Sequence, residues 1–98
     1  MARRFSIIPQ QHACYVCGAS NVKLHQHEAL FGTAHRKLSI QEGLVFYLCP
    51  NHHNASKDGV HFNRELDLKL KRIAQEEWLK QHNNDIDLWM KIFRRNYI

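Results

Sequence analysis

The pattern of apolar and polar residues predicts two strands in the first half of the chain. Residues 22–27 alternate in polarity, which is typical of a half-buried strand and places His25 and His27 on the same face. Residues 44–48, with the sequence LVFYL, are apolar and rich in strand-forming types, as expected of a buried second strand. Residues 28–43 mix polar side chains with two glycines, so we expect a long loop there with room for one helical turn.

Three helices are predicted after the second strand. Pro50 is well placed to open a short helix that runs to about residue 57. Asn63 is a suitable N-cap for a longer helix, whose apolar residues recur at near-helical spacing. Asn83 and Asn84 interrupt that helix, and Asp85 can cap a final one. Two strands and three helices predict a small α+β fold.

The length of 98 residues suits one domain with a modest core. We divide it into a basic arm at residues 1–13, a core at residues 14–62 and a helical extension at residues 63–98. No apolar run approaches the roughly 20 residues that a membrane span needs, so we expect a cytoplasmic protein without a membrane partner. The formal net charge of +5 favours a polyanionic partner, most commonly nucleic acid, and Arg3 and Arg4 of the arm could reach a phosphate backbone.

The cysteine pattern changes this picture most. Cys14 and Cys17 form a C-x₂-C pair, and Cys49 stands apart beside two histidines. In a reducing compartment such spacing favours a metal over a disulfide. Zinc takes four soft or borderline ligands, so we predict a structural zinc ion held by Cys14, Cys17, Cys49 and His52.

Either of two adjacent histidines fits the fourth ligand position. His52 gives the spacing C-x₂-H, whereas His53 gives C-x₃-H. Because neighbours on a helix point about 100° apart, the two imidazoles should serve different centres. We assign His52 to the zinc ion and expect His53 to face another site.

Further histidines cluster around these predicted ligands. A lone histidine is usually structural, but five within 37 positions indicate more: they are His25, His27, His35, His53 and His61. If the strands pair and the short helix packs across them, the strand-borne histidines lie near His53. Such a cleft could supply a base and a metal ligand.

Several separated segments together resemble HNH endonucleases, which are also called ββα-metal nucleases. They are residues 24–28 (LHQHE), the pair Arg36 and Lys37, the strand at 43–48, residues 49–53 (CPNHH) and residues 59–61 (GVH). The similarity covers roughly residues 14–70 and is strongest to small phage-encoded members akin to the Ref family of recombination-enhancing nucleases. It implies a zinc-stapled ββα-metal finger, with a two-stranded antiparallel hairpin and a helix, followed here by two C-terminal helices. It also implies a phage or prophage origin.

The resemblance assigns roles by position. It implies that His27 is the general base that activates water, and that His53 and His61 hold a catalytic divalent metal. His25, on the same strand face as His27, is a further candidate ligand. The resemblance leaves Mg²⁺, Mn²⁺, Ni²⁺ and Zn²⁺ open, although imidazole ligands suit Zn²⁺ or Ni²⁺ and Mg²⁺ prefers oxygen donors.

Two positions depart from the family's pattern. Gln26 stands where many members have Asp or His directly before the base. Gly43 and Leu44 occupy the place of an Asn that orients the base, so His35 or another loop residue would have to take its role.

The expected function is metal-dependent hydrolysis of phosphodiester bonds in DNA, with duplex DNA as the partner. Arg36, Lys37 and Lys57 are candidate phosphate contacts. The two departures leave one alternative, a non-catalytic zinc module that binds DNA through a decayed HNH site. A second alternative is a protein-interaction domain or homodimer that docks through the helices carrying Trp78 and Trp89.

Overall fold

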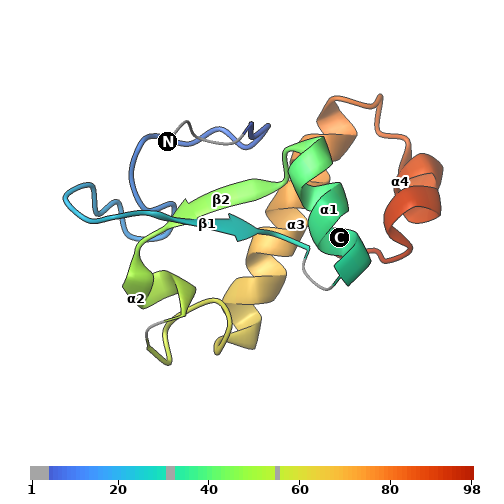
Figure 1. Cartoon of the computed structure of the whole chain (residues 1–98). Coiled ribbons are helices and arrows are strands. Elements are labelled where there is room, and N and C mark those ends of the chain that lie inside the picture. Colours follow the sequence, from blue (N-terminus) through green and yellow to red (C-terminus); the bar gives the residue numbers. More distant parts are fainter. Residues whose placement is uncertain (1–4, 31–32, 55) are drawn as a thin grey trace.

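The computed structural model describes residues 5–30, 33–54 and 56–98, and every structural statement below concerns these residues. They form an α+β fold with a two-stranded sheet and four helices (Figure 1). Its elements are β1 (His25–Glu28), α1 (Thr33–Glu42), β2 (Val45–Leu48), α2 (Pro50–His53), α3 (Arg64–Lys80) and α4 (Ile86–Phe93). The predicted α+β class and both strands are confirmed, although β1 begins at residue 25 rather than 22. The helix α2 ends at residue 53 rather than near 57, and α1 stands where the sequence predicted a long loop.

The helix α1 ends at a glycine of the segment that the sequence predicts to be a loop. Gly43 has a φ of +74°, and its amide and that of Leu44 donate to the carbonyls of Ile40 and Ser39, at 3.3 and 2.8 Å. These two bonds form a Schellman motif, in which glycine marks the residue after a helix. The loop prediction for residues 28–43 is therefore wrong over residues 33–42, and the other glycine of that segment, Gly32, lies outside the described residues.

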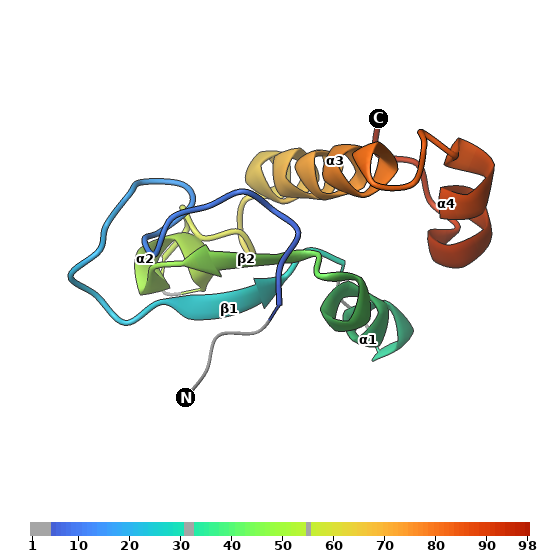
Figure 2. The ribbon, with the colours of Figure 1, turned by 90° about the horizontal axis from the view of Figure 1, so that it is seen from above.

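The sheet places α2 at one end and α1 at the other (Figures 1 and 2). β1 and β2 pair antiparallel, with His25 opposite Leu48 and Glu28 opposite Val45. All four residues of β2 are buried, which explains why this strand is uniformly apolar and aromatic.

The segment before β1 covers the free edge of β2. The hydroxyl of Ser6 donates to the carbonyl of Val45 at 2.7 Å, and the side-chain oxygen of Gln10 accepts from the amide of Tyr47 at 3.0 Å. These bonds satisfy backbone groups that an open strand edge would leave unpaired. The predicted basic arm is thus fixed to the sheet over residues 6–10, and Arg3 and Arg4 lie outside the described residues.

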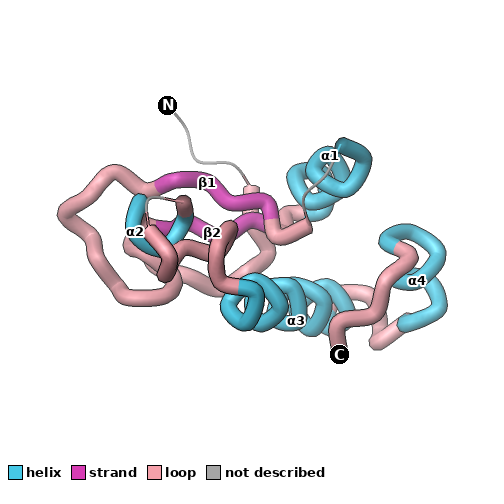
Figure 3. The backbone as a smooth tube through the Cα atoms, turned by 90° about the horizontal axis from the view of Figure 1, so that it is seen from below, coloured by secondary structure: helices cyan, strands magenta, loops and turns pink. Residues whose placement is uncertain are grey.

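The two C-terminal helices begin at the predicted caps and pack through their tryptophans. The side chains of Asn63 and Asp85 accept from the third amide of α3 and α4, at 3.1 and 3.0 Å. Figure 3 shows the two helices joined by a short connection. Trp78 and Trp89 are 0% exposed, with ring centroids 5.4 Å apart, so the tryptophans belong to the core.

Candidate metal centres

The three cysteines and His52 converge on one point. The Sγ atoms of Cys17 and Cys49 are 3.8 Å apart, and Nδ1 of His52 lies 3.3 Å from Sγ of Cys49 and 3.9 Å from Sγ of Cys14. A tetrahedral zinc ion with Zn–S bonds of about 2.3 Å places its sulfur ligands about 3.8 Å apart. The four predicted ligands therefore lie close enough together to hold a metal ion such as zinc.

Backbone hydrogen bonds prepare one thiol of this group for a metal. Burial raises the pKa of the Cys14 thiol, but hydrogen bonds from the backbone of Cys49, Cys17 and Val16 outweigh it and lower the pKa to about 6. Burial and the neighbouring thiols raise the pKa of Cys49. A single thiolate at neutral pH is the form that captures a cation, which then favours ionisation of the remaining thiols.

The short helix α2 directs His52 and His53 to different centres, as the sequence predicted. His52 faces the cysteines, whereas Nδ1 of His53 lies 3.0 Å from Nδ1 of His25 on β1. The segment after α2 folds back onto it, because the amides of Val60 and His61 donate to the carbonyls of His52 and His53, at 2.8 and 3.3 Å. A Cβ at Gly59 would lie 2.7 Å from the carbonyl oxygen of His53, so this return requires glycine.

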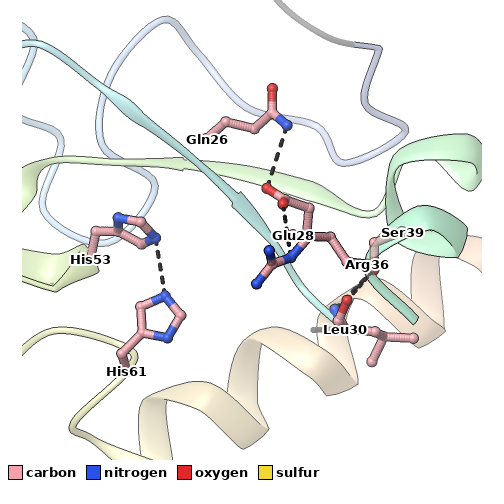
Figure 4. Close-up of polar contacts among 7 residues, drawn as sticks. All are labelled: Gln26, Glu28, Leu30, Arg36, Ser39, His53 and His61. Carbon is pink, nitrogen blue, oxygen red and sulfur yellow. Dashed lines mark hydrogen bonds and ion pairs between the residues drawn. The ribbon is translucent and has the colours of Figure 1, made fainter. Parts of the chain in front are cut away.

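The return of the chain creates a second group of potential ligands. Nε2 of His61 lies 3.1 Å from Nε2 of His53 (Figure 4). One ring nitrogen from each of His27, His53 and His61 lies within 4.8 Å of the other two. Zn–N bonds of about 2.0–2.1 Å in a tetrahedral site separate two nitrogens by about 3.3 Å, so these imidazoles fit a divalent ion without a large movement.

Burial keeps the inner imidazoles neutral. His27 is only 2% exposed, and burial followed by the nearby His53 and His61 lowers its pKa to about 3. Burial, His61 and His25 lower the pKa of His53 to about 4. A neutral imidazole is the form that binds metals, whereas an imidazole of such low basicity is a weak proton acceptor at neutral pH.

The three histidines open into a cleft of about 140 Å³. Its other walls are Gln26 and Glu28 of β1 and Arg36 of α1. Nε of Arg36 pairs with a carboxylate oxygen of Glu28 at 3.6 Å, and the Arg36 side chain is 60% exposed (Figure 4). The hydroxyl of Ser39 donates to the carbonyl of Leu30 at 2.8 Å and thereby fixes α1 to the end of β1, so that Arg36 lies over the cleft.

The remaining predicted site residues lie outside this cleft. Lys37 is exposed on α1, and Lys57 lines a separate depression with Asn54, Ser56 and Phe62. His35, the proposed substitute for the missing Asn, is not among the residues that line the cleft. The sequence pattern indicates no role for Glu28, and its position next to His27 in a strand is the one signal that points to it.

No known protein family, curated protein or solved structure matches this chain. Among the described helices, none combines the length and apolar character that a membrane-spanning segment requires.

Proposed function

We propose that this protein is a metal-dependent nuclease of the HNH type, which hydrolyses phosphodiester bonds of DNA. The observation that carries the proposal is the second group of imidazoles, at His27, His53 and His61, at the wall of an open cleft. A structural metal needs a closed ligand set, which the Cys₃His group already offers. Three ligands beside open space are instead the arrangement typical of a catalytic metal, whose remaining positions take water and substrate.

In this proposal the Cys₃His group holds a structural zinc ion and forms the staple of a ββα-metal finger built from β1, β2 and α2. The two sites share α2, because His52 belongs to one and His53 to the other. A structural ion would fix α2, and α2 in turn positions His53 and, through the backbone bonds at residues 60 and 61, His61. The staple would thus serve both stability and the geometry of the cleft.

We assign His27 to the third ligand position in preference to the general base implied by the resemblance. A ring nitrogen of His27 lies close to those of His53 and His61. The His27 side chain is only 2% exposed, which leaves little room for it to contact both a water molecule and a substrate directly. A divalent ion at this site would supply a nucleophilic water of lowered pKa and would offset charge on the phosphate. The three nitrogen ligands favour Zn²⁺ or Ni²⁺ over Mg²⁺, with Mn²⁺ between them.

Arg36 would bind the phosphate backbone at the mouth of the cleft. Its guanidinium group is largely exposed and already held in place by Glu28, so binding a phosphate requires little reordering of the side chain. Lys37 follows on the same helix and would contact a neighbouring phosphate, while Lys57 would act beyond the far end of α2.

The alternative of a non-catalytic DNA-binding zinc module has one specific observation in its favour. Gln26 lines the cleft with an amide, which is a poorer metal ligand than a carboxylate or an imidazole. Glu28 is the only carboxylate among the residues that line the cleft, and it is paired with Arg36. Such a module would bind DNA in a salt-sensitive way without cutting it.

A matched pair of variants separates the two functions. We expect His53→Ala to bind DNA as the wild type does, because the basic residues remain, but to lose nicking of supercoiled plasmid. His35→Ala, which makes the same change outside the cleft, should nick at the wild-type rate. DNA binding without nicking by the wild type would favour the non-catalytic module, and equal nicking by all three proteins would move the active site elsewhere.

A further inference from the structure

Both ring nitrogens of His53 have a histidine partner. Nε2 lies 3.1 Å from Nε2 of His61, and Nδ1 lies 3.0 Å from Nδ1 of His25. The His25 and His53 rings meet edge to face, with an interplanar angle of 85° and centroids 5.1 Å apart. The three imidazoles thus form a row with His53 in the middle and His25 on the side away from His61.

The position of His25 distinguishes it from the three grouped imidazoles. The group whose nitrogens converge contains His27, His53 and His61, and His25 is not a member. Beside the His25–His53 pair, the described residues offer no third histidine, cysteine or carboxylate ligand. A site of two imidazoles alone would bind an ion weakly, so the contact between His25 and His53 needs another explanation.

The chemistry of a neutral imidazole supplies it. Such a ring carries one N–H, and the other nitrogen has the lone pair that can bind a metal. If Nε2 of His53 binds an ion, the proton of His53 must sit on Nδ1. That N–H then donates to Nδ1 of His25, which accepts and carries its own proton on Nε2.

We propose that His25 is a positioning residue, which accepts a hydrogen bond from Nδ1 of His53 and so orients Nε2 of His53 toward a divalent ion. The proposal rests on the ion site of the proposed function but not on DNA cleavage. Metal-bound histidines commonly donate their second N–H to a carboxylate, a backbone carbonyl or water, and loss of that partner weakens metal binding. Here a neutral imidazole on β1 takes that role.

The sheet makes His25 a rigid partner for this task. His25 is paired across the sheet with Leu48, the residue directly before Cys49, and Cys49 is the N-cap of α2. The backbone that carries His25 and the backbone that leads into the helix of His53 are therefore hydrogen-bonded neighbours. Their separation is set by the sheet and by the Cys₃His group rather than by a flexible loop.

Titration with Co²⁺ tests the proposal without DNA. Protein that already carries one zinc ion per chain is titrated with Co²⁺, and the visible absorption spectrum and competition with a chelator give the affinity of the second site. His25→Phe keeps a ring but removes the acceptor, and we expect affinity to fall about 10- to 100-fold. His25→Asn keeps an oxygen acceptor near the Nδ1 position and should restore most of the affinity. His35→Phe, the matched control on α1, should bind as the wild type does.

The protonated nitrogens give a second measurement that does not depend on how a variant folds. In ¹⁵N NMR spectra of wild-type protein with zinc in both sites, His53 should carry its proton on Nδ1 and His25 on Nε2. A proton on Nε2 of His53, wild-type affinity in His25→Phe, or no second ion bound by the wild type would each overturn the proposal. If the ion binds with the expected protonation but plasmid is not nicked, the nuclease function fails and the role of His25 stands.

Discussion

The burial of His27 predicts how the stability of the protein changes with pH. In the folded protein burial and the neighbouring imidazoles lower the pKa of His27 to about 3, whereas an exposed histidine in the unfolded chain has a pKa of about 6.5. As the pH falls, the unfolded chain therefore takes up a proton that folded His27 does not. The free energy of unfolding falls as the pH drops below about 6.5, and the loss ends only near the folded pKa of about 3.

The size of this effect can be worked out for a pH range in which the zinc ligands are not stripped. Between pH 7.5 and 5.5 an unfolded histidine goes from about one-tenth to about nine-tenths protonated. If folded His27 stays neutral throughout, it accounts for about 1.4 kcal/mol of lost stability over these two pH units. Any folded pKa well below 5.5 gives the same result, so the figure does not depend on the exact value. His53 acts in the same direction, because burial and the nearby His61 and His25 also lower its pKa in the folded protein.

The substitution His27→Phe isolates this contribution. It keeps an aromatic ring in the buried position but removes the proton site. Urea unfolding at pH 7.5 and 5.5 gives the loss of stability for each protein, with one zinc ion per chain and no other divalent ion added. We expect the loss to be smaller in the variant by about 1.4 kcal/mol. Proton uptake by the zinc ligands is common to both proteins and cancels in the comparison. The same pH dependence in both proteins would contradict this prediction, since His27 would then titrate equally in the folded and unfolded states.

Three further predictions concern the staple, the basic surface and the core. Cys17→Ser should unfold or aggregate, because the binding energy of such a zinc site is on the order of 10 kcal/mol or more and matches the stability of a whole domain. A folded, metal-free Cys17→Ser variant with an unchanged melting temperature would contradict this prediction. The double variant Arg36→Ala, Lys37→Ala should reduce the slope of log affinity for duplex DNA against log salt concentration by the equivalent of up to about two phosphate contacts. An unchanged slope would place the DNA surface elsewhere. Trp89→Ala, which removes an indole that is 0% exposed, should cost about 3–5 kcal/mol in denaturant unfolding, and a loss below about 1 kcal/mol would contradict its place in the core.

Local signals in the sequence predicted the parts of the fold that depend on neighbouring residues. The caps at Asn63 and Asp85 act within three residues, and both bonds are present. Asn83 and Asn84 lie in the turn after α3, which ends at Lys80, and their φ values of 55° and 56° are a conformation that asparagine tolerates better than most residues. The cysteine spacing predicted the Cys₃His group in the same way, because two ligands with two residues between them can face one ion.

The helix α1 was not predicted because glycine occurs both in loops and directly after the end of a helix. A glycine such as Gly43 is typical of a loop, but a glycine with positive φ also ends many helices. The residues before it include good helix formers such as Arg36, Leu38 and Glu42, and their propensity was the signal that the two glycines concealed. The N-terminal segment escaped prediction for another reason, since its hydrogen bonds to β2 join residues more than 30 positions apart.

The arrangement of the histidines was only partly predictable. The period of a strand placed His25 and His27 on one face, and the helix turn separated His52 from His53. Which strand histidine joins His61 and which contacts the far side of His53 depends on the return of the chain at Gly59, where a side chain would meet the His53 carbonyl at 2.7 Å. Such a close approach is a tertiary contact that no spacing in the sequence reveals.

If the second group of imidazoles holds the ion that cuts DNA, as we propose, cleavage depends on filling that site with a second ion. Protein with one zinc ion per chain is given increasing amounts of Zn²⁺, Ni²⁺, Mn²⁺ or Mg²⁺, and nicking of supercoiled plasmid is followed together with ion content. We expect the wild type not to nick at one ion per chain and to nick increasingly as the second site fills. The His61→Ala variant should not nick at any ion concentration at which its second site stays empty. Nicking that is complete at one ion per chain, or a filled second site without nicking under any of the four ions, would contradict the claim.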